Sequence, residues 1–143
     1  MEDNNISISF SFKTIEILES YIKLPLNHPP DFKVFSFDIS TEIQIIPDNS
    51  LLAIILSVKI FNESKDLHLG SLTTSCVFFV ENFKEVVKLD SNNNFKISDQ
   101  FLVTLNSISI STTRGIMWST FKGTFLHNAL LPILDPKPNA LSE

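Results

Sequence analysis

The segment SISISTTRGIMWSTFKGTF, residues 107–125, decides the fold of this chain because it carries two conflicting periodicities. Its first half alternates isoleucine with serine, which is the period of two that a half-buried strand shows. Its second half places Gly115, Met117 and Trp118 in no strand pattern. The local pattern and the β-branched residues of 107–113 favour a strand, whereas the longer pattern favours a helix.

The helical interpretation begins upstream of the segment, at Ser98. This residue is a suitable N-cap, and Asp99 then places an acid in the first turn, where the helix dipole favours it. A helix of about 35 Å that continues from there has apolar residues on two opposite faces. One face holds Phe101, Leu105, Ile108, Thr112 and Ile116, and the other holds Val103, Ile110, Met117 and Phe121. We expect this helix to form and to be covered on both sides, because neither apolar face can remain in water.

The first half of the chain is expected to form strands. Apolar residues alternate with serine over 6–12, and the alternation breaks at 17–22, which indicates a bulge or a change of partner strand. Asn-His-Pro-Pro at 27–30 indicates a connector, because its two prolines donate no ladder hydrogen bonds. Residues 35–45 then alternate most cleanly and predict the second strand.

Two further strands are expected before the helix. Residues 47–50, Pro-Asp-Asn-Ser, have the composition of a tight turn. Residues 51–62 return as a strand that begins with apolar residues on both faces, which is typical of a strand in the middle of a structure. Residues 67–80 are long enough for the fourth strand, so the strands follow one another in a meander-like succession.

Length and charge limit the possible functions. The 143 residues suffice for a single domain that buries about 70% of its unfolded surface, with 1–5 and 137–143 expected to be flexible tails. A net charge of −5 argues against nucleic-acid binding, which needs clustered lysine and arginine. No apolar run approaches the roughly 18 residues that span a bilayer, and the polar, acidic N-terminus is unlike a signal peptide. We expect a soluble, cytoplasmic protein without membrane insertion.

The residues that usually carry chemistry are sparse and scattered. The single cysteine, Cys76, lies among apolar residues and is expected to be a small buried side chain. His28, His68 and His127 are far apart and have no metal-ligand spacing. The three glycines form no phosphate-binding loop. We therefore expect no catalytic residue, metal or other cofactor.

The order of these features resembles the SecB-like proteins, which are the protein-export chaperones and their relatives. The resemblance is carried by TTRGIMWSTFKGTFLHNALLPILDP, residues 112–136, and by LESYIKLPLNHPPDF, residues 18–32. It implies an α+β fold in which a four-stranded antiparallel sheet packs on one long C-terminal helix. It also implies a homotetramer, a dimer of dimers that assembles through sheet edges and helices. The helices lie between the sheets in such an assembly, which gives the second cover that a helix with two apolar faces requires.

The resemblance also predicts which residues contact other chains. The oligomer interface is expected to contain residues from the outer helix face and its end: Val103, Ile110, Met117, Trp118 and Phe121. Glu19 matches an acid with which the family contacts the translocase motor ATPase, but Lys23 stands where another acid is expected. The chain after Pro136 is a short polar tail where the export chaperones have a further helix. A relative that protects an antitoxin therefore fits as well as an export factor.

Five phenylalanines are the candidate client-binding residues: Phe35, Phe37, Phe78, Phe79 and Phe83. The alternative, that these aromatic residues only form the core, stays open at this point. Neighbours in a strand point to opposite faces, so either Phe78 or Phe79 must point away from the helix. The function predicted from these residues is that of an ATP-independent holdase, which binds unfolded polypeptides through exposed apolar grooves. The alternatives are a small-ligand-binding or acyl-thioester enzyme on a helix-on-antiparallel-sheet fold and a purely structural oligomer.

Overall fold

The computed structural model describes residues 7–24 and 33–133. The two expected tails and the predicted connector at 27–30 lie outside these residues. The main elements are β1 (Phe10–Ile22), β2 (Phe35–Ile46), η1 (Pro47–Asn49), β3 (Leu51–Asn62), β4 (His68–Val80) and α2 (Asp99–Thr120). A short helix, α1 (Phe83–Val86), and a small hairpin of β5 (Lys88–Leu89) and β6 (Phe95–Lys96) lie between β4 and α2.

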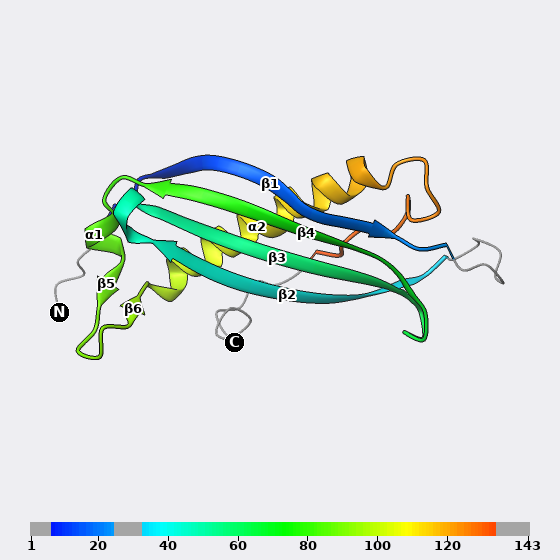
Figure 1. Cartoon of the computed structure of the whole chain (residues 1–143), viewed down its shortest axis with the longest axis horizontal. Helices are drawn as coiled ribbons and strands as arrows, with labels where there is room; N and C mark the ends of the chain where they lie inside the picture. Colours follow the sequence, from blue (N-terminus) through cyan, green and yellow to red (C-terminus); the bar gives the residue numbers. More distant parts are fainter. Residues whose placement is uncertain (1–6, 25–32, 134–143) are drawn as a thin grey trace.

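The four long strands form one antiparallel sheet in the order β1-β4-β3-β2 (Figure 1). Strands β2, β3 and β4 follow one another as the predicted meander. The first strand departs from that prediction, because β1 pairs with β4 and not with β2. Strands β1 and β2 are therefore the two edges of the sheet.

The long helix is confirmed, and the strand interpretation of residues 107–113 is wrong. The Ser98 side chain accepts a hydrogen bond from the Phe101 backbone N–H at 3.2 Å, as expected of an N-cap. The helix then continues to Thr120, and the Phe121 N–H still donates to the Met117 carbonyl. Helical spacing over the whole segment thus outweighs the β-branched content of its middle.

The predicted division of α2 into two opposite apolar faces is wrong. Seven of its residues are buried: Phe101, Leu105, Asn106, Ser109, Ile110, Thr113 and Met117. At 100° per residue this buried side is centred between the two predicted faces, and its middle holds the small polar residues Ser109 and Thr113. The buried side moves around the helix from Phe101 at the start to Met117 at the end. A straight helix that crosses a twisted sheet produces such a shift.

A polar contact in the middle of α2 separates two apolar clusters. The Thr113 and Thr74 hydroxyls lie 2.8 Å apart, and the Thr113 hydroxyl donates to the Ser109 carbonyl at 2.7 Å. On one side is the Phe121 cluster, which includes Leu56, Ile60, Leu72, Met117, Phe121, Leu126 and Leu131. On the other side is the Phe101 cluster, which includes Leu52, Ile54, Cys76, Phe78, Phe83, Phe101 and Leu105. The helix thus packs on the sheet through one apolar cluster on each side of this polar contact.

Candidate binding surfaces

Strand β1 exposes a row of apolar side chains on the side of the sheet that faces α2. Phe12, Ile15, Ile17 and Ile22, which we call the β1 strip, pair with Phe78, Cys76, Thr74 and Gly70 of β4. Directly paired residues of an antiparallel ladder lie on the same face, and these partners are buried under α2. The four side chains of the strip are themselves 39% to 51% exposed. The strip is thus a continuation of the core face that the described chain covers only by about half.

Two bulges keep the β1 strip on one face. The register shifts once between Phe12 and Thr14 and again between Ile17 and Glu19. Because successive strand residues point to opposite faces, a strand without these extra residues would turn Ile15 and Ile17 outward. The break that the sequence shows at 17–22 is therefore a bulge, and the change of partner strand is excluded. Bulges at the edge of a sheet often direct side chains toward a binding site.

The position of α2 explains why the β1 strip remains exposed. The helix packs against β3 and β4, the two central strands. The half-buried side chains of β2, such as Phe37 and Ile43, also reach the two core clusters. On the β1 side, Ile8, just before the strand, and Phe10, at its start, pack in the same way, and the Phe10 ring lies 5.3 Å from that of Phe101. The rest of β1 extends past the covered area.

Phe79 points to the outer face of the sheet, opposite α2, and beside it lies a groove of about 550 Å³, which we call the outer groove. It is lined by residues from the first, third and fourth strands and from η1: Ser11, Phe12, Lys13, Asn49, Leu51 and Phe79. Phe79 pairs with Ser11 on one side and with Leu51 on the other, so it lies between these two lining residues. Its lining thus combines three apolar residues with two polar residues and one lysine.

The five predicted client-binding phenylalanines do not form one surface. Phe79 is 38% exposed on the outer face, which agrees with the expectation that one of the two neighbours points away from the helix. Phe78 and Phe83 are buried in the Phe101 cluster, and Phe35 and Phe37 are half-buried against the Phe121 cluster. In the isolated chain these four residues pack against the core, Phe35, Phe37 and Phe78 from the sheet and Phe83 from α1.

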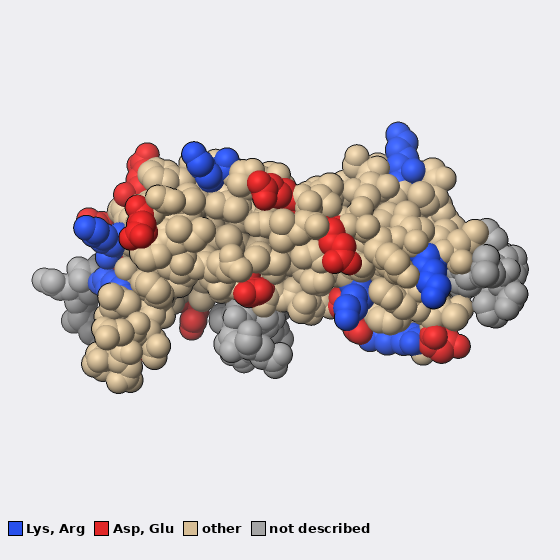
Figure 2. Space-filling model, in the orientation of Figure 1, with Lys and Arg blue, Asp and Glu red and all other residues tan. Residues whose placement is uncertain are grey.

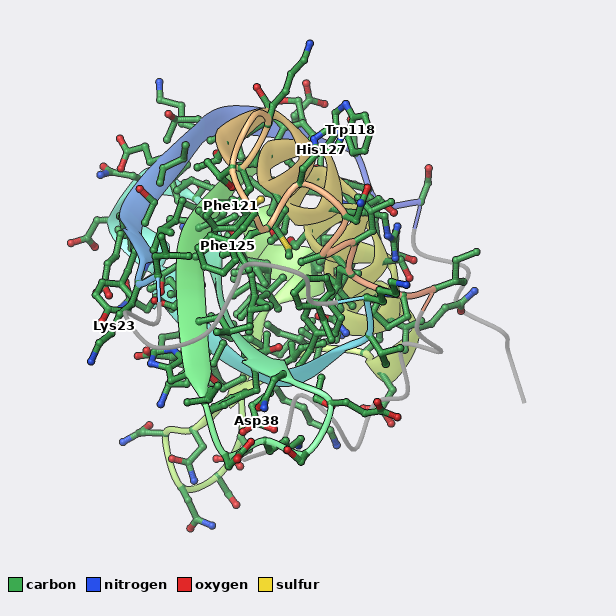
Figure 3. The ribbon with its side chains drawn as sticks, turned by 90° about the vertical axis from the view of Figure 1, so that its right-hand side faces the viewer. Lys23, Asp38, Trp118, Phe121, Phe125 and His127 are labelled. Carbon is green, nitrogen blue, oxygen red and sulfur yellow. The ribbon has the colours of Figure 1, made fainter. Side chains whose placement is uncertain are left out.

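The predicted oligomer-interface residues also separate. Ile110, Met117 and Phe121 are buried in the Phe121 cluster, so the chain's own sheet already covers them. The sequence predicts that these three residues form a second apolar face that points away from the sheet, and this part of the prediction is wrong. Val103 is half-buried, and Trp118 is 45% exposed with its ring 4.7 Å from that of His127. Figure 3 shows this pair on the far side of α2 from the sheet, whereas Phe121 points inward.

The outward side of α2 has an unusual composition. Ser107, Ser111, Gly115 and Trp118 lie on it, and Asp99 and Arg114 are the only charged residues of the whole helix. The Arg114 side chain is already used, because it donates to the Leu131 and Pro132 carbonyls at 2.8 Å each. A β-carbon placed on Gly115 would meet no atom within 4 Å. An exposed helix face without charges is more typical of a contact surface than of a solvated one.

Glu19 lies on the outer face of the sheet, opposite Thr73 of β4, and is exposed. Glu16 and Glu42 are exposed on the same face, opposite Ser75 and Ile55. The sheet lies in front of α2 in Figure 1, so Figure 2 displays this face with isolated acidic and basic side chains on a mostly uncharged surface. No continuous band of one sign covers it.

The single cysteine and the possible metal ligands can be located among the described residues. Cys76 is fully buried, and this burial raises the pKa of its thiol more than the nearby Ser109 hydroxyl lowers it. The thiol is therefore protonated and unreactive at neutral pH. In the part of the chain that the structure describes, no three histidine, cysteine or acidic side chains gather as metal ligands would. Among the described helices, none has both the length and the hydropathy that crossing a bilayer requires.

This arrangement of sheet and helix occurs in a known structure. It is that of the Mycobacterium tuberculosis SecB-like chaperone Rv1957, solved in complex with a ChAD peptide from the Rv1956 HigA1 antitoxin. The two chains superpose with a TM-score of 0.59 over 87% of this chain and 90% of the other, at 10% sequence identity. This protein has a SecB-like fold. The SecB-like resemblance and the α+β fold class predicted from the sequence are thereby confirmed.

Sequence comparison alone does not reach this similarity. No family model matches the chain. No curated protein matches it either. At 10% identity the likeness concerns the fold, and the function of a fold is determined by the side chains of its own surface.

Proposed function

We propose that this protein is a cytoplasmic, ATP-independent chaperone that binds unfolded polypeptides and prevents their aggregation. The observation that carries the proposal is the β1 strip, a row of core-type side chains that the chain's own helix leaves exposed along an edge strand. Monomeric proteins usually protect such an edge, because it invites pairing with other chains. Burial of apolar surface has no directional requirement, so one strip accepts many client sequences.

The expected strength of the strip favours an assembly. Full burial of an exposed isoleucine or phenylalanine contributes about 1.5–3 kcal/mol, so each half-exposed side chain of the strip contributes about 1 kcal/mol. Four such contributions correspond to a dissociation constant of about 1 mM. One strip is too weak to hold a client at cellular concentrations. Several strips on one oligomer, bound by one extended client, raise the overall affinity through effective concentration.

Two surfaces suit the assembly of identical subunits. The free backbone edge of β1 can pair with β1 of a second copy, and this leaves the strip side chains exposed as a continuous apolar row from two subunits. The uncharged outer side of α2, with Gly115, Ser111 and Trp118, can pack closely on a helix of another copy. Val103 is the other residue of the predicted interface that remains accessible. Together these contacts give the dimer of dimers expected from the SecB-like resemblance.

The nature of the client also follows in part. The structurally similar chaperone of Mycobacterium tuberculosis was solved with an antitoxin peptide, which favours an antitoxin as a client of this protein as well. Lys23 follows the end of β1, close to Glu19, and opposes contact with a basic surface of the translocase motor. We therefore place protection of an antitoxin before delivery of export precursors to the motor.

The test compares the two edges of the sheet in an aggregation assay. A chemically unfolded protein is diluted into buffer with the full chain at equal concentration, and light scattering is recorded. We expect the wild type to suppress scattering and the Ile15→Ser/Ile17→Ser variant to lose most of this effect. Ile46→Ser, which changes an exposed isoleucine at the end of β2, is the matched control and is expected to retain suppression. No suppression by the wild type would refute the chaperone function.

Two further variants separate the surfaces. Phe79→Ser probes the outer groove, and loss of suppression by this variant alone would move the client site to the outer face. Gly115→Leu probes assembly, because its side chain meets open space in the single chain but would obstruct close helix packing. We expect the mass measured by light scattering to fall in this variant while its thermal unfolding is unchanged. Wild-type protein that is monomeric at all concentrations would exclude the assembly.

A further inference from the structure

The small hairpin formed by β5 and β6 holds two apolar side chains away from the core. It projects from the body at the lower left of Figure 1, beyond the end of the sheet. Leu89 and Phe95 are directly paired in its ladder and are 60% and 44% exposed. The chain is anchored on either side of the hairpin, because Val87 and Ile97 pack in the Phe101 cluster. The hairpin is therefore a defined projection.

The turn of the hairpin is built by Asp90. Its carboxylate accepts hydrogen bonds from the backbone N–H groups of Asn92 at 2.8 Å and Asn94 at 2.9 Å. The Asp90 N–H donates to the Asn94 carbonyl at 2.9 Å, and the Asn93 N–H donates to the Asp90 carbonyl at 3.1 Å. Asn93 has a φ of 61°, a conformation that asparagine tolerates better than most residues. These bonds fix the shape of a ladder that would be marginal by itself.

The hairpin also brings two like charges together. Lys88 and Lys96 are directly paired, and like charges at such positions destabilise a ladder. Within residues 7–24 and 33–133 neither ammonium group takes part in an ion pair. Alternation along the strands places the two lysines on one face of the hairpin and Leu89 with Phe95 on the other. A carboxylate between the lysines would remove their repulsion.

We propose that the β5–β6 hairpin is a docking element for an acidic and apolar segment of another polypeptide. The carboxylates of the segment lie at Lys88 and Lys96, and its apolar side chains cover Leu89 and Phe95. This site is separate from the β1 strip and does not depend on binding of unfolded clients there. It gives the protein a means to select a particular partner by charge, which the apolar strip lacks.

A peptide fits this site better than an anionic membrane surface does. The tip of the hairpin, Ser91–Asn94, is polar and has no side chain suited to enter a bilayer. Asp90, Glu85 and Asp99 lie on the hairpin or beside it in the chain and would repel a continuous anionic surface. A short segment can place its few carboxylates at the two lysines and avoid these acids.

The test uses a fluorescent synthetic peptide in which glutamate alternates with phenylalanine, and anisotropy is measured with the full-length protein. We expect Lys88→Glu/Lys96→Glu to weaken binding about tenfold or more, the equivalent of about 1.4 kcal/mol. Lys84→Glu, on the neighbouring α1, is the matched charge control and is expected to change affinity less than about twofold. A peptide in which lysine replaces glutamate is expected not to bind.

Each of the following outcomes would overturn the proposal. The first is that Lys88→Glu/Lys96→Glu binds the peptide as tightly as the wild type, and the second is that Lys84→Glu loses as much affinity as this double variant. The third is that the protein binds vesicles of phosphatidylcholine and phosphatidylserine but not the peptide. Leu89→Ser/Phe95→Ser is expected to weaken peptide binding as well. Leu130 is as exposed as Phe95 but lies elsewhere, and Leu130→Ser is expected to leave peptide binding unchanged. If Ile15→Ser/Ile17→Ser instead abolishes peptide binding, the peptide occupies the β1 strip and the hairpin assignment is wrong. All these positions are exposed, and unfolding curves verify that each variant is folded.

Discussion

The edge strands β1 and β2 belong to one sheet and are similar in length, yet their helix-side residues are covered to different extents. In β2 the residues Phe37, Ile39 and Ile43 are half-buried against the two core clusters. In β1 the corresponding positions, Ile15 and Ile17, are about half exposed. The outer positions of β2 carry Asp38 and Glu42, charges that oppose pairing with another strand. One edge is closed by packing and charge, and the other is left open.

This difference shows which elements contribute most of the buried apolar surface that stabilises the fold. Strands β3 and β4 and helix α2 form the core, and β2 is tied to it by its own apolar side chains. Strand β1 is tied by its backbone ladder to β4 and by Phe10 at its start. The two bulges of β1 keep the side chains of the β1 strip on the side of the sheet that faces α2, although these side chains remain about half exposed. A strand that contributes more apolar surface than its fold covers is suited to contact other chains.

The largest expected effect is the difference in unfolding free energy lost when each of two stacked phenylalanines is replaced, one from the core and one from the exposed strand β1. Phe12 of β1 stacks on Phe78 of β4 at 4.9 Å, but Phe78 is 1% exposed and Phe12 is 45% exposed. We expect Phe78→Ala to cost about 3–5 kcal/mol of unfolding free energy, because it leaves a cavity in the core. We expect Phe12→Ala to cost about 1 kcal/mol. Denaturant unfolding of both variants measures the difference, and equal costs would mean that β1 is covered in solution.

The attachment of β1 at its far end depends on Gly70. A β-carbon at this position would lie 2.7 Å from the Tyr21 carbonyl oxygen and 2.7 Å from the Leu126 side chain. The backbone oxygen cannot yield without moving β1, so we expect Gly70→Ala to cost about 2 kcal/mol. Hydrogen exchange should increase at Lys23, whose N–H donates to the Leu69 carbonyl at 2.9 Å.

The β2 amides serve as the internal reference for Gly70→Ala. Their exchange should stay unchanged, since β2 lies at the opposite edge of the sheet. Equal acceleration in both edge strands would mean that the substitution loosens the whole sheet. The proposed independence of β1 would then be wrong.

A pair of isoleucines compares the edges directly. Ile43 of β2 packs against the Phe101 cluster, whereas Ile17 of β1 is 51% exposed. We expect Ile43→Ser to cost about 2 kcal/mol, through lost packing and a poorly solvated hydroxyl. We expect Ile17→Ser to cost less than about 1 kcal/mol and to reduce aggregation of the protein itself. Thermal unfolding and light scattering measure the two effects, and a reversed order of stability would contradict the assignment of the edges.

The sequence predicts the parts of this fold that depend on local pattern. Ser98 and the long helical spacing predict α2, and alternation predicts the strands, because capping and periodicity act between residues close in the chain. The pairing of β1 with β4 is less accessible, since the choice between two edges depends on contacts far apart in sequence. The same limit applies to the helix face. Ile110 and Met117 face the sheet only because α2 crosses it obliquely, and that angle is set by packing.

The candidate site was harder to predict than the fold. The aromatic content of the sequence indicates Phe35, Phe37 and Phe78 as binding residues, but residue type does not distinguish a core phenylalanine from an exposed one. The signal that locates the β1 strip is the shift of apolar phase from Phe12 to Ile15. A period of two that changes phase without a turn residue indicates a bulge, and bulges are frequent where an edge strand serves a function.

The smallest expected effect concerns the charges that close the β2 edge. Lys65 forms an ion pair with Asp38 at 2.7 Å, and both side chains are about half exposed. Such a pair contributes less than about 1 kcal/mol, so Lys65→Ala should leave unfolding almost unchanged. Asp38→Ala/Glu42→Ala should also leave stability nearly unchanged but should increase self-association, because it removes the charges that keep β2 from pairing with a second copy. Sedimentation at several protein concentrations distinguishes the two variants. Unchanged self-association of Asp38→Ala/Glu42→Ala would mean that packing alone protects the β2 edge. The difference between β2 and β1 would then depend only on the position of α2.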